Sequence, residues 1–269
     1  VFRHDLRKAI TVLTLAGGLA STVFWPLTQW LESSFGWREA MLALAAINLV
    51  VCVPLHAIFL PRRGRASHEP RGAADDPAGR AKLLADWHFR ALAIAFTLNM
   101  LAFSGITLHL LAMLASKGLT PERAAILGAL VGPMQVAGRV VEFTFAKHAT
   151  PSAVGVIALA AFPLAVLVLA FAGPQDWVFV VFAALWGASN GVMTIVRGTV
   201  PAEIWGRDGY GGLTGLMATP VLLARAVGPF FAAWLLAAMG GYTPMALAFA
   251  AIGVVALASF ASAVWFNRR

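Results

Sequence analysis

Long apolar stretches separated by short polar segments dominate this chain. A helix that crosses a bilayer needs about 20 mainly apolar residues, and eight stretches of the sequence reach that length. They cover approximately residues 9–31, 39–60, 89–115, 121–143, 152–173, 177–199, 212–238 and 243–266. The pattern therefore predicts an all-α, polytopic membrane helix bundle with eight spanning helices.

The composition points the same way and excludes several classes of protein. The chain is 60% hydrophobic and only 12% charged, whereas soluble domains are about 25% charged, so lipid must serve as part of its solvent. The single cysteine, Cys52, excludes a disulfide framework and a cysteine metal cluster. The six histidines are scattered, and the sequence has no phosphate-binding loop or zinc-protease motif. We therefore expect no cofactor, no metal site and no catalytic residues, and a protein that is not an enzyme.

The basic residues flank the apolar stretches and set an expected orientation. The net charge is +8, and sixteen of the twenty lysines and arginines fall on the side that holds both chain ends and the polar segment 61–88. Three fall on the other side, and Arg225 lies within a stretch. Cytoplasmic loops carry such an excess of positive charge. The sequence thus predicts cytoplasmic termini, a cell inner membrane location, and a lipid bilayer rather than nucleic acid as the partner.

A weak internal repeat suggests how the helices are organised. The run that starts at Gly36-Trp37 resembles the run that starts at Gly241-Tyr242, 205 positions later, and Pro26 corresponds to Pro229 at a similar spacing. The two stretches at the start of the chain would then match the last two in the same orientation. Parallel repeats of this kind occur in secondary transporters.

The repeat divides the chain into two parts joined by a loop. Residues 1–60 are predicted to be the last two helices of one six-helix half, and residues 89–269 to be a complete second half. The polar segment 61–88, rich in Pro and Gly, is predicted to be a flexible cytoplasmic loop between them. Because the second half has four helices without a counterpart, we expect this chain to be a fragment that lacks four upstream helices.

This organisation resembles the major facilitator superfamily, and the resemblance covers the whole chain. It rests on the six-plus-six topology, on the basic central loop and on local motifs. Gly17-Gly18 followed by Phe24-Trp25-Pro26 is similar to the family's fifth helix, although many antiporters of the family have Gly-Pro in place of Trp25-Pro26. Gly138-Arg139 with Glu142 and Lys147 is similar to its cytoplasmic gating motif. The resemblance implies a fold with eight of twelve helices present, and a gating role for Arg139 and Glu142.

Arg225 is the most informative single residue. It lies near the middle of the stretch 212–238, and a guanidinium at the bilayer centre costs about 2.5–3.5 kcal/mol on insertion scales unless it faces a wet or paired interior. Guanidinium groups suit bidentate recognition of carboxylates. Arg225 is therefore predicted to bind an anionic substrate or to pair with a coupling carboxylate. A purely structural pairing between helices is the alternative.

Polar side chains in other stretches complete the predicted substrate site. Asn99, Gln135 and Asn190 lie near mid-depth of their stretches, and amides in lipid seek partners in the bundle interior. Together with Arg225 they are predicted to line the substrate site.

Two further features concern protons and gating. His109 lies toward the outer end of its stretch and suits a proton relay near neutral pH, with an interhelical hydrogen bond as the alternative. Arg207 and Asp208, together with Arg197 and Glu203, form a predicted cytoplasmic cluster that would latch one half against the other. An ordinary solvated loop is equally compatible with that cluster.

These observations predict a secondary active transporter of a small organic solute, anionic if Arg225 binds it. It would act as a monomer, with coupling to protons, by rocking two halves around a midplane site. An efflux carrier for drugs or toxic compounds is the alternative within the same fold. A membrane sensor or enzyme without transport is a further alternative, and it would need an intramembrane cluster of acids or histidines that this sequence lacks.

Overall fold

The structure is an all-helical membrane fold. The computed structural model describes residues 12–13, 17, 23–24, 27–28, 30–59, 76–146, 148–173, 175–206 and 208–265. Every regular element in these ranges is a helix, and seven helices are long and apolar enough to cross a membrane. The predicted fold class is thereby confirmed for a multi-pass membrane protein. Most of the first predicted span, 9–31, lies outside the described residues.

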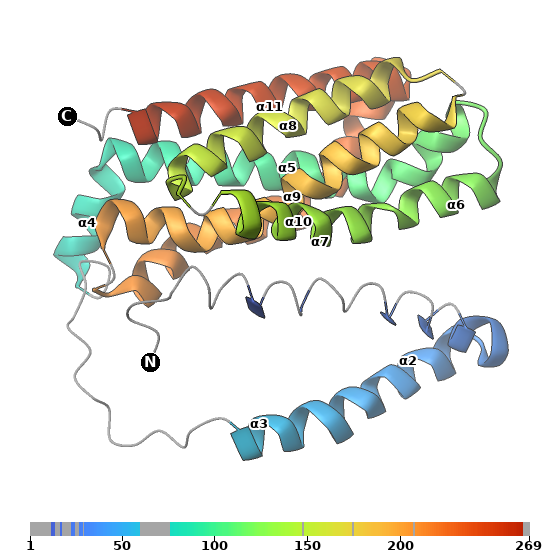
Figure 1. Ribbon diagram of the computed structural model, residues 1–269, viewed down its shortest axis with the longest axis horizontal. Helices are drawn as coiled ribbons and strands as arrows, with labels where there is room; N and C mark the ends of the chain where they lie inside the picture. Colours follow the sequence, from blue (N-terminus) through green and yellow to red (C-terminus); the bar gives the residue numbers. More distant parts are fainter. Residues whose placement is uncertain are drawn as a thin grey trace.

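Six of these spans form a bundle of roughly parallel axes (Figure 1). They are α5 (Trp87–Ser116), the broken span α6 (Pro121–Ala129) and α7 (Val131–Phe145), α8 (Pro151–Phe171), α9 (Asp176–Trp205), α10 (Tyr210–Met239) and α11 (Tyr242–Trp265). Ordered by packing, α7 contacts α9, α9 contacts α8, α8 contacts α11, α11 contacts α5, and α5 contacts α10. The helices α7 and α10 therefore end this series. The face between them, backed by α9 and α5, lies opposite the face of α8 and α11.

Local sequence signals start three of the helices. Asp76, Thr120 and Thr150 each precede a proline, and their side chains accept hydrogen bonds from the backbone N–H groups of Gly79, Arg123 and Ala153. An N-cap acceptor followed by proline at the first helical position satisfies or removes N–H groups that have no intrahelical partner. The starts of α4, α6 and α8 are therefore encoded by adjacent residues.

The span predicted at 121–143 is broken in the structure. Helix α6 ends at Ala129, and α7 begins at Val131. Pro133 explains the break, because its nitrogen has no hydrogen to donate to the carbonyl of Ala129 and its ring crowds that carbonyl. The span predicted at 177–199 differs in the opposite way, since α9 continues through Pro201 to Trp205.

The segment predicted as a flexible loop, 61–88, contains a helix. Residues 76–88 are described, and α4 (Pro77–Ala85) occupies most of them, with Leu83 buried. Asp86 then caps α5, because one of its carboxylate oxygens accepts from the backbone N–H of His88 at 2.9 Å. Its other carboxylate oxygen accepts from Trp205 Nε1 at 3.1 Å. Asp86 therefore joins the start of α5 to the end of α9, at what we call the α4 end of the bundle.

Helices α2 (Trp37–Ile47), η1 (Asn48–Cys52) and α3 (Val53–Phe59) form one apolar span that lies apart from the six-helix bundle (Figure 1). The π-helical turn η1 precedes Pro54, which cannot donate to the carbonyl of Val50. Helix α2 starts at Trp37 directly after Gly36, and α11 starts at Tyr242 directly after Gly241. The two helix starts are thus 205 positions apart, the spacing of the sequence repeat. The duplication and the domain limits built on it stay predictions.

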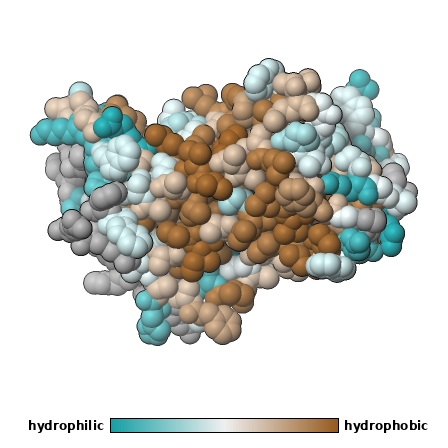
Figure 2. Space-filling model, turned by 90° about the horizontal axis from the view of Figure 1, so that it is seen from above, coloured by the Kyte–Doolittle hydropathy of each residue, from teal (hydrophilic) through white to brown (hydrophobic). Residues whose placement is uncertain are grey.

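The outer surface is apolar where lipid would lie. On α8 and α11, Ile157, Phe171, Val254 and Val255 are exposed. Figure 2 shows a broad apolar belt across the middle of this face and hydrophilic residues gathered at its two ends. A soluble monomer rarely exposes an apolar surface of that extent, so the belt fits the hydrocarbon layer of a bilayer.

Glycines allow the closest helix crossings. Where α7 crosses α9, a Cβ on Gly187 would lie 2.6 Å from Met134 Cβ, and a Cβ on Gly138 would lie 2.6 Å from Ala188 Cα. Where α5 crosses α10, a Cβ on Gly105 would lie 2.9 Å from the carbonyl oxygen of Gly228. Small residues let membrane helices pack this closely, and these crossings fix the positions of the helices that carry the predicted site.

Candidate anion-binding site

The predicted site residue Arg225 lies near the middle of α10 and is exposed. One turn earlier on the same face lies Val221, and the series continues through Ala218 and Thr214 to Tyr210. Residues spaced by three or four positions share a helix face, so Arg225 extends a stripe of α10 whose other members line a cavity.

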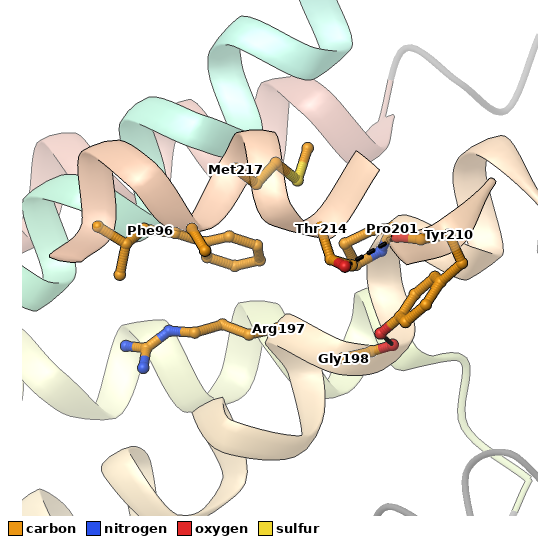
Figure 3. A pocket seen from close by; sticks show the side chains of 9 residues that line it. Phe96, Arg197, Gly198, Pro201, Tyr210, Thr214 and Met217 are labelled. Carbon is orange, nitrogen blue, oxygen red and sulfur yellow. Dashed lines mark hydrogen bonds between the residues drawn. The ribbon is translucent and has the colours of Figure 1, made fainter. Parts of the chain in front are cut away.

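That cavity has a volume of about 240 Å³ and lies between α5, α9 and α10 (Figure 3). The residues that line it are Phe96 from α5, Arg197, Gly198 and Pro201 from α9, and Tyr210, Thr214, Met217, Ala218 and Val221 from α10. Figure 3 shows Phe96 and Met217 on one side and Arg197 on the other. The cavity therefore combines apolar walls with one cationic group.

Arg197 is the residue that sequence reasoning assigned elsewhere. It was grouped with a predicted cytoplasmic cluster because its predicted span ends at residue 199, whereas α9 continues eight residues beyond Arg197 to Trp205. A guanidinium nitrogen of Arg197 donates to Asn99 Oδ1 at 2.9 Å. Its Nε is buried and has no hydrogen-bond partner. Asn99 itself is 3% exposed, so this amide holds the guanidinium from the α5 side.

Arg197 and Arg225 form a pair of like charges. The positive charge of Arg225 acts on the Arg197 guanidinium from the neighbouring helix. Among the described residues, no aspartate or glutamate forms an ion pair with either arginine. Removing a charged group from water costs several kcal/mol unless it gains a partner. Two cationic groups without an acidic partner among the described residues therefore favour an anion at this site.

The backbone at both arginines is also unusual. Pro201 follows Arg197 by four residues, and Pro229 follows Arg225 by four residues. Because proline has no N–H, neither arginine carbonyl can accept the usual intrahelical hydrogen bond. Near the first of these positions, the Tyr210 hydroxyl donates to the carbonyl of Gly198 at 2.6 Å and so ties α10 to α9. Freed carbonyls in membrane helices are tolerated where other groups satisfy them.

The two other predicted site residues lie at the crossing of α7 and α9. Gln135 is half-buried, and its backbone contacts the position that a Cβ on Gly191 would occupy. Asn190, also half-buried, precedes Gly191 and shares a face of α9 with Arg197, seven residues later. Of the four predicted substrate-site residues, Asn99 accepts a hydrogen bond from Arg197, and the charge of Arg225 acts on the same guanidinium. The structure places Gln135 and Asn190 about two helical turns away along α9.

The predicted gating residues of α7 lie inside the bundle. Arg139 and Glu142 are each 5% exposed, and Arg139 Nε donates to the carbonyl of Gly191 at 3.1 Å. This contact holds α7 against α9 within the six-helix bundle. A gating role for the two residues stays a prediction.

The remaining predicted residues lie apart from the cavity. His109 is half-buried near the far end of α5, where its ring centroid is 6.3 Å from that of Tyr242. Asp208 is exposed in the turn before α10, and Arg207 lies outside the described residues. Glu203 accepts hydrogen bonds from the backbone and the hydroxyl of Ser152, so it joins α9 to the start of α8. The described part of the chain holds no cluster of histidine, cysteine and acidic residues suited to a metal ion.

Comparison with known proteins supports a transporter family. The family model described as Major Facilitator Superfamily matches residues 1–169. Monocarboxylate transporter 13 of Rattus norvegicus is 28% identical over 205 residues, which cover 72% of this chain and 45% of the rat protein. Monocarboxylate transporter 13 of Bos taurus is 32% identical over 137 residues, which cover 48% of this chain and 29% of the bovine protein. The matched regions thus span less than half the length of either relative.

Proposed function

Because the chain belongs to the major facilitator superfamily, we propose that it forms part of a secondary transporter for a small organic anion. The anion binds between α5, α9 and α10, where Arg225 and Arg197 supply the positive charge. Transport follows from rocking two six-helix halves around this site. The protein is a carrier and not an enzyme.

The observation that carries the proposal is the pair Arg197 and Arg225. Their charges repel each other, and the described residues supply no acid to offset them. A carboxylate placed between the two guanidiniums replaces that repulsion with charge-assisted hydrogen bonds, which are about twice as strong as neutral ones. A neutral or cationic solute would leave the repulsion in place.

The names of the relatives support the same class of solute. Both matched relatives are named monocarboxylate transporters, and a monocarboxylate presents the charged end that this site is arranged to bind. We therefore favour a monocarboxylate over a drug-like efflux substrate.

Protons and orientation belong to the proposal as well. His109 lies ten residues after Asn99 on α5, which is about 15 Å along the helix. A proton relay through His109 would therefore act at a distance from the anion. We further propose a monomer in the cell inner membrane with the α4 end in the cytoplasm, because the basic residues favour that side. If a thiol reagent that cannot cross the membrane labels an Asp208→Cys variant from outside the cell, this orientation is wrong.

The test is uptake of radiolabelled carboxylates by the full-length protein in liposomes. Arg225→Ala is expected to reduce uptake at least tenfold, and Arg225→Lys to give an intermediate loss, because an ammonium group keeps the charge and loses the bidentate geometry. Arg123→Ala is the matched control, since Arg123 is exposed and forms a surface ion pair with Asp176 at 3.0 Å. Such pairs contribute little to stability, and uptake should stay within about twofold.

Two results would contradict the proposal. If Arg225→Ala and Arg225→Lys both transport carboxylates as well as the unaltered protein, Arg225 does not bind the anion. If the unaltered protein moves cationic drugs and no carboxylate, the efflux alternative is correct.

A further inference from the structure

We infer that the corner between α4 and α5 binds the headgroup of an anionic phospholipid, with the acyl chains of the lipid along the exposed face of α5. The corner lies at Asp86, where the backbone is extended, and Figure 1 shows α4 leaving the line of α5 there and running across the end of the bundle. The residues that form this α4–α5 corner are Lys82 and Leu84 of α4, and Trp87, Arg90 and Ile94 of α5.

Two exposed cations meet at the corner. Arg90 donates from a terminal guanidinium nitrogen to the carbonyl oxygen of Ala85 at 3.0 Å, which places its charge at the end of α4. A guanidinium has five N–H groups, so the exposed Arg90 keeps donors for a further acceptor. Lys82 is exposed and lies three residues before Ala85, about 4.5 Å along the helix axis. The flexible lysine stem can cover that distance, so one phosphate can contact both cations.

The acidic residues nearest to the corner are engaged elsewhere. Asp76 caps the start of α4, and both carboxylate oxygens of Asp86 accept hydrogen bonds that join α5 to α9. Among the described residues, neither Lys82 nor Arg90 forms an ion pair with an acid. Anionic lipids give the cytoplasmic leaflet a negative surface potential, and the α4 end is the proposed cytoplasmic end. The charge of the corner is therefore complementary to that leaflet.

Apolar side chains show that the complementary anion carries a hydrocarbon part. Trp87, Arg90 and Ile94 share one face of α5, because they are spaced by three and four positions. Leu84, Trp87 and Ile94 are 50%, 55% and 49% exposed. Ile94 lies about 6 Å from Arg90 toward the middle of the helix, and tryptophan prefers the membrane boundary. A free phosphate ion would leave this apolar surface in water, whereas a phospholipid covers it.

Contacts with α11 hold the corner in place before any lipid binds. His88 Nδ1 lies 2.8 Å from the carbonyl oxygen of Ala263, and the hydroxyl of Ser259 donates to the carbonyl of Ala91 at 2.9 Å. Leu83 of α4 is 7% exposed and packs into the core of the bundle. Binding to a site that is already ordered costs less conformational entropy, so a single lipid is sufficient to occupy it.

The experiment measures binding of dioleoyl phosphatidylglycerol and dioleoyl phosphatidylcholine to the purified full-length protein by native mass spectrometry. The two lipids have the same acyl chains and differ in net charge. Each basic residue near the lipid surface contributes about fivefold to the affinity for an anionic lipid. Phosphatidylglycerol should therefore bind about 25-fold more tightly than phosphatidylcholine.

Variants test the location. Lys82→Gln exchanges an exposed side chain and should lower the affinity for phosphatidylglycerol about fivefold, and adding Arg90→Gln should remove the remaining preference. Arg90→Lys keeps the charge and should keep the preference, which separates the charge from the hydrogen bond to Ala85. Arg123→Gln is the matched control at the opposite end, because Arg123 is exposed and paired with Asp176 at 3.0 Å. It should change the affinity less than twofold.

The outcomes that would overturn this inference are distinct. Equal binding of the two lipids would show that the corner does not select an anionic headgroup. A double variant that keeps the full preference, or an equal loss in Arg123→Gln, would show that the lipid does not bind at Lys82 and Arg90. If inorganic phosphate raises the melting temperature of the unaltered protein as much as phosphatidylglycerol does, the occupant is a free anion. None of these measurements requires transport, so the proposed function is tested separately.

Discussion

The crossing of α7 and α9 offers a sharp test of the geometry that supports the site. A Cβ added at Gly191 would lie 2.9 Å from both the carbonyl carbon and the Cα of Gln135, and still closer to the carbonyl oxygen of Gln135. Optimal carbon–carbon contacts lie at about 3.5–4.0 Å, so the two helices would have to separate by about 0.6 Å or more. The obstructing atoms belong to the backbone, and no change of rotamer can relieve the contact.

Gly191→Ala should therefore destabilise the protein. Overpacking of this kind costs about 1–3 kcal/mol, and it is offset in part by a helix-propensity gain of about 1 kcal/mol for replacing glycine by alanine. Gly215→Ala is the matched control, because Gly215 is also helical and has nothing within 4 Å of an added Cβ. Both variants gain the same helix propensity, so the difference between them isolates the cost of overpacking. The free energy of unfolding should differ between the two variants by about 1–3 kcal/mol.

The assay is thermal or denaturant unfolding of both variants in the same detergent. Separating the helices would also lengthen the hydrogen bond from Arg139 Nε to the carbonyl of Gly191, which is 3.1 Å in the structure. Equal stability of the two variants would refute the close crossing of α7 and α9, and with it the placement of Gln135 beside Gly191.

Two further predictions concern the ends and the break of the helices. Asp86→Ala should lower the free energy of unfolding by about 2 kcal/mol, from loss of a cap worth about 1 kcal/mol and of a hydrogen bond worth about 1 kcal/mol. Trp205→Phe removes only the second contact and should cost about half as much; equal losses in denaturant unfolding would show that the cap does not contribute. Pro133→Ala should restore the hydrogen bond to the carbonyl of Ala129 and join α6 to α7, which hydrogen exchange would detect as slower exchange at residues 129–133. Unchanged exchange there would mean that packing, and not Pro133, breaks the helix.

The helices were predictable because lipid imposes a simple requirement on sequence. Every backbone polar group in the hydrocarbon layer must be paired within its own helix, so each span appears as a long apolar stretch. Five of the predicted ranges match described helices closely, for example 212–238 with Tyr210–Met239. The two that differ most in detail, 121–143 and 177–199, both contain or adjoin a proline.

Proline shows why span boundaries were harder to predict. Pro201 resembles a helix end, yet α9 passes through it, and Pro133 lies within an apolar stretch, yet the helix breaks before it. The carbonyl that loses its usual donor at Pro201 belongs to Arg197, and at the next residue Tyr210 of α10 donates to the carbonyl of Gly198. The local sequence contains no information on whether such a neighbour exists, so how far Arg197 lies from the end of its helix was not predictable.

The sequence alone determined that this is a membrane protein of the major facilitator type and that Arg225 is exceptional, because a charge within an apolar stretch is visible without any knowledge of packing. Only the tertiary structure decided that Arg197 lines the cavity between α5, α9 and α10. Its partner Asn99 lies 98 positions away in the chain, and the like charge beside it comes from another helix. Contacts between helices depend on which faces meet, and in a bilayer uniformly apolar helices leave that choice to close packing of small residues and to a few polar groups.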